Sequence, residues 1–389
     1  MSVINRTNAS DLRGVLRLAV DAAVGVTDVV ETMHHTIQLR HAPLGESRAG
    51  RTGGLTGFVY SSIRGTTRLI GKGLDAGMAP LIAMLPETVS NATRDNLVAA
   101  INGVYGDHLA ATGNPLATAM AFRYRGKVLD PGEAQAVTSG NGKLLLWVHG
   151  LCLNDEHWTR AGVNRGEALA TDLGYTPLYL RYNTGLPISA NGRELAAMLE
   201  RLLQNWPHQV DELVIAGHSM GGLVARSACH YGRLASHNWL QHLHRLVFIG
   251  TPHHGAPLER GGSWIDHALD LSPYTAPFTR LAKSRSAGIT DLRHGSINDD
   301  EQDFVALPDG VECYAMAATR AKKPSRIHER LIGDGLVPLD SALGRSRVPA
   351  RNLNIPENRQ WIIYETGHIQ LLGHAGVYMQ MRDWLLQKN

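Results

Sequence analysis

The stretch LVIAGHSMGGLVARSACHYG, residues 213–232, decides the fold of this chain. Its first four residues are an apolar run typical of a buried strand, and the residues from Leu223 onward favour a helix. The segment GHSMGG connects the two and places Ser219 on a sharp turn from strand to helix. In such a turn the glycines leave room for a strained backbone, and the helix N-terminus stabilises developing negative charge. The pattern predicts a nucleophilic serine; its position between strand and helix disfavours the alternative of a purely structural turn.

Further apolar runs of the same kind flank this stretch on both sides. They predict strands buried on both faces, at residues 144–148, 177–182, 212–217, 245–250, 313–317 and 361–365. Helical patterns fill most of the gaps, at residues 157–173, 191–205, 220–231 and 371–387. Residues 121–129 alternate apolar and polar side chains around Arg125-Gly126 and predict a short hairpin. We therefore expect an α/β fold with a mostly parallel sheet and helices on both faces.

The N-terminal residues follow a different pattern. Apolar side chains recur every three or four residues from Ser10 to Val26, and Ser10 is a good N-cap. A second helix is expected over residues 29–37, and others over about 58–72 and 88–104. We expect an all-helical region 1–115 and an α/β domain 116–389. The helical region could contact a membrane surface or a partner, or pack on the rest of the protein; its mixed charges favour packing.

A serine hydroxyl needs a base and a group that orients the base. His368 follows the strand expected at residues 361–365, so a strand end would deliver it to the sheet edge. His374 is the alternative base, but it is expected inside the last helix. Asp334, in a loop after the strand at residues 313–317, is the candidate orienting carboxylate, with Asp340 as the nearest rival. The order Ser219, Asp334, His368 is the expected order of nucleophile, acid and base.

Acyl transfer also needs donors for the oxyanion. Gly150 follows the strand at residues 144–148 and would let the backbone turn, so that the N–H of Leu151 faces Ser219. The N–H of Met220 would be the second donor. The alternative interpretation of His149-Gly150 is a plain turn that ends the strand.

An apolar insertion separates two of the expected core strands. Within residues 255–310 the side chains of Trp264, Leu271 and Phe278 belong to a local apolar cluster. We expect this segment to form a lid or cap over a site for an acyl chain, with these three side chains in contact with substrate. The alternative is packing on the sheet.

Composition excludes several function classes. The chain has 389 residues, of which 43% are hydrophobic, so extended disorder is excluded. The formal net charge is only +3, which argues against nucleic-acid binding. The absence of an apolar run of about 18 residues argues against a transmembrane helix, and the first residues show no secretory signal. A cytoplasmic location is therefore expected, with Cys152, Cys229 and Cys313 as reduced thiols.

Five motifs in this order resemble a known group. They are VHGL at Val148, AGHSMGGLVAR at Ala216, GTPHHGAPL at Gly250, GDGLVP at Gly333 and TGHIQLL at Thr366. The chain resembles the α/β hydrolase superfamily and, within it, the lipase-like and PGAP1-like serine esterases, over about residues 140–389. The resemblance implies a Ser219, Asp334 and His368 triad, an oxyanion hole at Leu151 and Met220, and a cap after Gly255.

One departure from this group concerns calcium. Secreted bacterial lipases that the chain resembles often carry an aspartate ligand two residues after the catalytic histidine, and Gln370 stands there instead. The histidine pairs 242/244 and 253/254 lack a carboxylate or cysteine that completes a metal site, so we expect no metal.

The expected activity is that of a serine carboxylic-ester hydrolase without a cofactor, acting on a small acyl ester or a lipid. The same residues leave open a thioesterase, an amidase or an acyltransferase, as well as a binding protein on a hydrolase scaffold. The sequence does not specify the oligomeric state.

Overall fold

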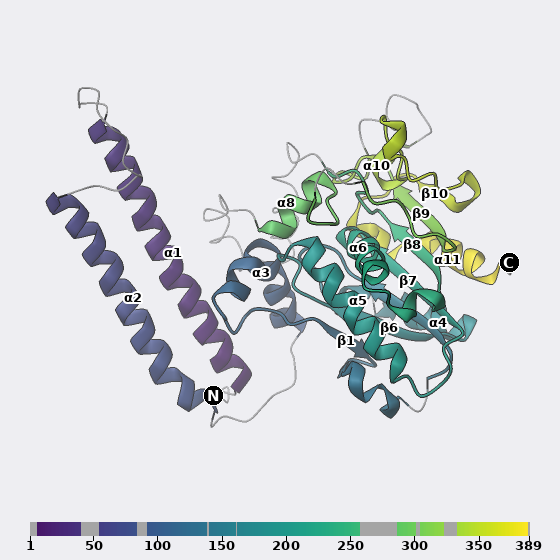
Figure 1. Ribbon diagram of the computed structural model, residues 1–389, viewed down its shortest axis with the longest axis horizontal. Coiled ribbons are helices and arrows are strands. Elements are labelled where there is room, and N and C mark those ends of the chain that lie inside the picture. The colour runs from purple at the N-terminus through teal and green to yellow at the C-terminus, as the bar shows by residue number, and fades with distance from the viewer. Residues whose placement is uncertain are drawn as a thin grey trace. The chain divides into compact units, whose positions relative to one another are not determined.

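The structure, a computed structural model, describes residues 6–39, 54–83, 92–137, 140–160, 162–256, 286–300, 304–322 and 333–387. The chain divides into two compact units (Figure 1). One contains residues 1–90 and 109–117, and the other contains residues 91–108 and 118–389. Most of helix α3 (Ala92–Ala111) thus lies in the larger unit. The sequence had placed this helix in the N-terminal region, since nothing in its own pattern shows what it packs against.

The smaller unit is built on two long helices, α1 (Arg6–Leu39) and α2 (Gly54–Ala83), which pack against each other. The expectation of two helices between residues 10 and 37 was wrong, because α1 continues through Gly25 without a break. Packing against α2 offsets the weak helix propensity of one glycine. Ion pairs also join the helices: the Arg13 and Arg17 guanidinium groups each lie 2.5 Å from Asp75.

The larger unit contains a sheet of eight strands in the order β10-β9-β8-β7-β3-β6-β1-β2. Six of these strands run parallel: β3 (Lys143–Val148), β6 (Thr176–Arg181), β7 (Glu212–His218), β8 (Leu243–Ile249), β9 (Glu312–Ala318) and β10 (Gln360–Ile363). The antiparallel hairpin of β1 (Ala121–Tyr124) and β2 (Lys127–Leu129) pairs with the edge at β6. Every apolar run predicted as a strand forms one, and the predicted fold class is confirmed.

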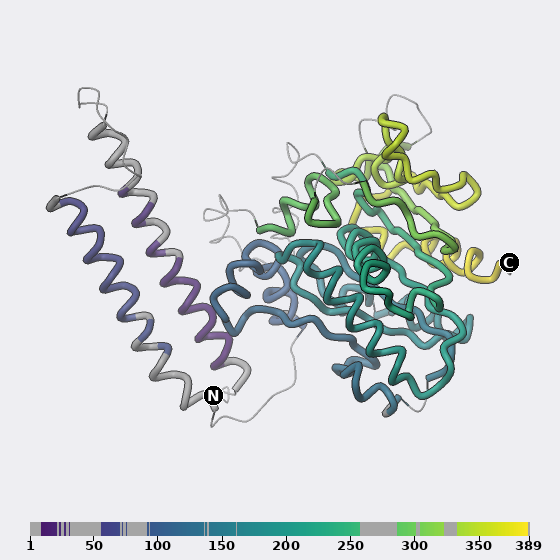
Figure 2. Tube along the Cα trace, in the orientation of Figure 1, coloured from purple at the N-terminus to yellow at the C-terminus, as the bar shows by residue number. Residues whose placement is uncertain are grey.

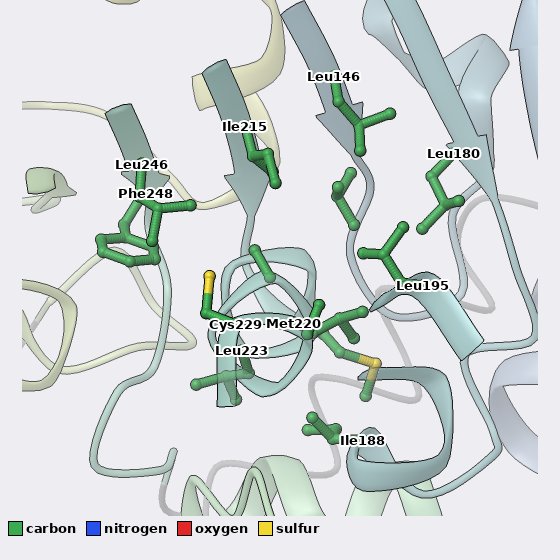
Figure 3. Packing of buried hydrophobic residues seen from close by; sticks show 14 of the residues in the cluster. Leu146, Leu180, Ile188, Leu195, Ile215, Met220, Leu223, Cys229, Leu246 and Phe248 are labelled. Carbon is green, nitrogen blue, oxygen red and sulfur yellow. The ribbon is translucent and has the colours of Figure 1, made fainter. Parts of the chain in front are cut away.

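Helices cover both faces of this sheet. On one face α5 (Ile188–Gln204) and α6 (Met220–Leu234) pack over a core of apolar side chains. Figure 3 shows Leu146, Ile215 and Leu246 pointing from neighbouring strands toward Met220 and Leu223 of α6. The other face packs against α4 (Arg165–Leu173) and α11 (Ala375–Leu386). Two short helices, α8 (Ala287–His294) and α10 (Leu339–Ala342), lie in the connections that follow β8 and β9.

Two helical predictions were too long at their N-terminal ends. The helix expected from His157 begins only at Arg165, because residues 155–158 form a 3-10 turn and β4 (Thr159–Arg160) pairs with β5 (Val163–Asn164). The final helix begins at Ala375 rather than Leu371, because His374 caps it: its Nδ1 accepts a hydrogen bond from the N–H of Gly376 at 3.0 Å. A local hydrogen bond decided this start, and the apolar period does not show it.

The core leaves the carboxyl ends of the parallel strands free to carry loops. Figure 2 traces the chain as a tube coloured from the N-terminus to the C-terminus. In parallel sheets ligands bind at this edge, so a functional site is expected in the loops after β3, β7, β8, β9 and β10. Among the described residues, no helix is both long enough and apolar enough to cross a membrane.

Candidate active site

Ser219 lies at the tip of the turn from β7 to α6, as predicted. Its backbone has φ 56° and ψ −124°, a conformation that costs energy for a residue with a side chain. The turn is tight enough to exclude side chains on both sides. A Cβ at Gly221 would overlap the carbonyl oxygen of Val148, and one at Gly222 would overlap Oγ1 of Thr251. The N–H of Ser219 donates to the carbonyl of Ile249 at 2.9 Å. The glycines and this bond hold the strained serine in place.

Asp334 and His368 form a buried hydrogen-bonded pair. Nδ1 of His368 lies 2.6 Å from Oδ2 of Asp334, and the two residues are 2% and 1% exposed. The other carboxylate oxygen of Asp334 accepts hydrogen bonds from the N–H groups of Leu336 and Val337 at 2.9 and 2.8 Å. These bonds fix the carboxylate, and the carboxylate fixes the ring so that a proton sits on Nδ1. Nε2 of His368 is then the nitrogen that can accept a proton.

The loop of His368 lies beside the serine turn. The N–H at Nε2 of His218, the residue before Ser219, donates to the carbonyl of His368 at 3.2 Å. The two imidazole rings have their centroids 4.7 Å apart. On the other side, a Cβ at Gly250 would lie 3.2 Å from Cε1 of His368. Sequence analysis missed His218, although its place between Gly217 and Ser219 brings it next to any base that serves Ser219.

His218, His149 and His157 are buried histidines of the larger unit. Burial, and next the positive charge of a protonated His368, hold the pKa of His218 well below its usual value. Burial also lowers the pKa of His149 to about 4 and that of His157 to about 3. These three rings are therefore neutral at pH 7. A neutral His218 has one N–H, and the bond to the carbonyl of His368 uses it.

The loop after β3 passes directly beside Ser219. A Cβ at Gly150 would come within 2.9 Å of the Cβ of Ser219, so only glycine allows this approach. Leu151 and Met220, the two predicted oxyanion donors, are buried at this point. Within the described part of the chain, their N–H groups have no carbonyl partner in the surrounding loops. The geometry leaves these donors available and favours a functional interpretation over a plain turn.

Helix α3 supports the loop after β3 from behind, a contact that the sequence did not reveal. The Cys152 thiol lies 3.8 Å from the carbonyl of Ala100, and a Cβ at Gly103 would overlap Cys152 Sγ. Cys152 itself has φ 60°. Further along the loop, the Asn154 side chain donates to Asn96 Oδ1 at 3.0 Å. The only sequence signal for this contact is the pair of glycines at 103 and 106, which lets a helix approach another backbone closely.

The rival residues have other roles. His374 caps α11, and Asp340 lies in the first turn of α10, whereas the carboxylate 2.6 Å from Nδ1 of His368 belongs to Asp334. Gln370, at the place expected for a calcium ligand, accepts from the N–H of Gly367 at 2.7 Å. In the described ranges no group of three or more His, Cys, Asp or Glu side chains could hold a metal ion. Trp264, Leu271 and Phe278 lie outside the described residues, as does most of the expected lid.

A cavity of about 410 Å³ opens next to His368. It is lined by Arg320, Glu365, Gly367, His368, Ile369 and Gln370. This volume falls within the range of about 300–1,000 Å³ that small-molecule sites occupy.

Comparison with known proteins supports this description. Residues 140–321 match the family model described as the PGAP1-like alpha/beta domain. With the sheet order and the serine turn, this match decides the fold. The larger unit has the α/β-hydrolase fold. The resemblance inferred from the sequence motifs is confirmed, and the matched residues contain both Ser219 and the Gly150 loop.

Several solved structures resemble this fold. The mature lipase BlEst2 of Bacillus licheniformis is 20% identical, with a TM-score of 0.41 over 62% of this chain and 91% of that chain. The esterase Pf2001 of Pyrococcus furiosus is 14% identical, with a TM-score of 0.40 over 63% of this chain and 81% of that one. Aspergillus fumigatus lipase B is 11% identical, with a TM-score of 0.40 over 69% and 57%. A search of curated protein sequences finds no match.

Proposed function

We propose that this α/β hydrolase is a serine carboxylic-ester hydrolase that acts through an acyl-enzyme. The observation that carries the proposal is the buried bond of 2.6 Å between His368 and Asp334, in a loop that His218 ties to the nucleophile turn. A carboxylate, an imidazole and a strained serine at one sheet edge are the parts that acyl transfer needs.

In the proposed reaction His368 is first a base and then an acid. Nε2 of His368 takes the proton of the Ser219 hydroxyl while the serine oxygen attacks the ester carbonyl. The tetrahedral intermediate collapses, the alcohol leaves with the proton from His368, and Ser219 carries the acyl group. A water molecule then attacks the acyl-enzyme, His368 accepts its proton, and the acid is released as the proton returns to Ser219.

The N–H groups of Leu151 and Met220 would stabilise the negative oxygen of each tetrahedral intermediate. Removal of one such donor typically lowers kcat by about 10²–10³. Both donors are on short, fixed segments: Gly150 packs on Ser219, and Met220 begins α6. The free N–H groups at the start of α6 and the dipole of this helix of 15 residues add a positive potential at the same place.

The substrate is proposed to be an acyl ester of a small molecule or a lipid. The cavity beside His368 would receive one side of this ester. Within the expected cover, residues 255–310, the part that contains Trp264, Leu271 and Phe278 remains the proposed cover over the acyl chain. Ile289, Leu292 and Ile297, near the end of this range, pack in the core instead. A thioester or an amide would fit the same residues, since the triad does not choose the leaving group.

The test is covalent labelling of the full chain with a fluorophosphonate, followed by hydrolysis of p-nitrophenyl esters of increasing chain length. We expect one label, on Ser219, and its loss in Ser219→Ala together with a fall in kcat on the order of a millionfold. Ser227→Ala, on the same helix, is the matched control and should keep both label and turnover. A label on another residue, or turnover in Ser219→Ala equal to wild type, would contradict the proposal and favour a non-catalytic scaffold.

A further inference from the structure

A second cavity shares no lining residue with the cavity beside His368. It has a volume of about 170 Å³, well above the roughly 10–15 Å³ that a single water molecule requires. The residues that carry the argument are Arg226 on α6 and His253 and His254 in the loop after β8. His294, Ser296 and Arg351 complete the polar part of its wall.

The centre of this cavity is a buried cation. Arg226 is only 3% exposed, and its Nη2 donates to the carbonyl of Val305 at 2.6 Å. Its Nε has no hydrogen-bond partner, and no carboxylate of the described residues pairs with it. Burial lowers the pKa of Arg226 to about 10, so the guanidinium is still charged at pH 7. A buried charge without a counter-charge is costly, and proteins normally compensate it.

His253 adds a second unused donor. The Nη1 group of Arg226 donates to Nδ1 of His253 at 3.3 Å, so the proton of the neutral ring must be on Nε2. Nε2 of His253 is buried and has no partner among the described residues, and the same holds for Nε2 of His254. Burial, and next the charge of Arg226, keep the pKa of His253 well below its usual value, so the ring does not add a charge that would oppose Arg226.

No acidic side chain is among the described residues that line the cavity. Its described lining contains two arginines and three histidines, and no aspartate or glutamate. Several N–H donors that point from different elements toward one space suit an acceptor with several oxygens. A carboxylate offers two such oxygens and a phosphate four. The unpartnered nitrogens here are on Arg226 of α6 and on His253 and His254 in the loop after β8, and Arg351 lines the same cavity.

We propose that this cavity binds a small tetrahedral oxyanion of the phosphate type, with Arg226 and His253 as its principal ligands. The bound anion would accept hydrogen bonds from Nε of Arg226 and Nε2 of His253 and would neutralise the guanidinium. Arg226 is seven residues after Ser219 on α6, a rise of about 10 Å along the helix axis. The anion would therefore lie away from the Ser219 hydroxyl and would take no part in the proposed acyl transfer. It could be free phosphate or a phosphate carried by a substrate.

Titration of the full chain with inorganic phosphate tests the site without any assay of activity. Sodium chloride at equal ionic strength is the reference, because it screens surface charge equally. We expect saturable binding by calorimetry and a rise in Tm with phosphate concentration, since a ligand that binds only the folded state stabilises it. Arg226→Met should weaken phosphate binding about tenfold or more, and Arg233→Gln, an exposed arginine on the same helix, should leave it unchanged.

His253→Phe provides a second test if Arg226→Met does not fold. It retains an aromatic ring next to Phe248, whose centroid lies 4.6 Å away, and removes only the donor. Weaker phosphate binding in this variant supports the site. Absence of saturable phosphate binding by the wild type, or binding by either folded variant that equals the wild type, would overturn it.

The source of the anion is distinguished by a pair of short esters, one carrying a phosphate and the other neutral. If the site receives a substrate phosphate, Arg226→Met raises KM for the phosphate ester alone, and inorganic phosphate competes with that ester. If the site binds free phosphate, KM is equal in both proteins and phosphate changes only Tm and calorimetric binding. Both results support an oxyanion site, and they separate it from the serine chemistry, which fluorophosphonate labelling reports independently.

Discussion

Substitution of Gly103 on α3 tests whether this helix positions the oxyanion loop, residues 149–154 after β3, which contain the proposed donor Leu151. In Gly103→Ala the new methyl carbon would overlap Sγ of Cys152 and lie 3.1 Å from its Cα. Rotation of the thiol would relieve the overlap with Sγ but not the close contact with Cα of Cys152, so α3 or the loop must move. Ordinary contacts of this kind are 3.4–4 Å long, so the backbone must give by a few tenths of an ångström at least.

The expected effects on stability and on catalysis differ in size. Overpacking costs about 1–3 kcal/mol, and the better helix propensity of alanine offsets up to about 1 kcal/mol of this. The free energy of unfolding should therefore fall only modestly. Cys152 follows the proposed donor Leu151 directly, and displacement of a catalytic group by about 1 Å can lower the rate about 100-fold. We expect kcat for ester hydrolysis to fall between about tenfold and 100-fold, with little change in far-UV circular dichroism.

The assay is steady-state hydrolysis of a p-nitrophenyl ester, together with chemical unfolding of each variant. Cys152→Gly in the Gly103→Ala background removes the overlapping thiol and suits the φ of 60° at this position, so it should restore most of the lost kcat. Gly65→Ala is the control, because a methyl group there meets nothing within 4 Å. Wild-type kcat in Gly103→Ala, or no restoration in the double variant, would refute the idea that α3 positions the oxyanion loop.

Three further outcomes follow from the structure. Asp334→Asn should lower kcat on the order of 10⁴-fold while the protein stays folded, because the amide favours the wrong tautomer of His368; an unchanged kcat would remove Asp334 from the proposed triad. His218→Phe should lower kcat about tenfold without a change in KM, since one hydrogen bond that positions His368 is lost, whereas His208→Phe at an exposed position should have no effect. Burial depresses the pKa values of His149 and His157 in the folded state, so below pH about 6.5 the unfolded chain binds more protons than the folded chain, and the free energy of unfolding decreases as the pH is lowered. Urea unfolding between pH 7 and 4 should show a loss of about 1.4 kcal/mol per pH unit for each ring below pH about 6.5, and a flat profile would contradict this.

Local sequence pattern determined the sheet and the nucleophile turn. Strands buried on both faces are continuous apolar runs, and six such runs became the six parallel strands of the sheet. The strained backbone of Ser219 follows from glycines within three residues of it, so a short segment contains its cause. The adjacency of Asp334 and His368 was also expected, because parallel strands place their following loops at one edge. β9 and β10 pair directly in the sheet, and the loops that follow them bring Asp334 to 2.6 Å from His368.

Contacts between distant segments were decided only by the tertiary structure. The start of α4 depends on the pairing of β4 with β5, which occupies residues that the apolar pattern had assigned to the helix. The place of α3 depends on Gly103 and Gly106, whose missing side chains become informative only when Cys152 and Asn183 are seen beside them. The environment of Arg226 likewise has no signature in an amphipathic helix, because it depends on which groups the β8 loop and Val305 place around the guanidinium; among the described residues none of these is a carboxylate. Periodicity records which face of an element is buried, and the partner on that face is a property of the whole chain.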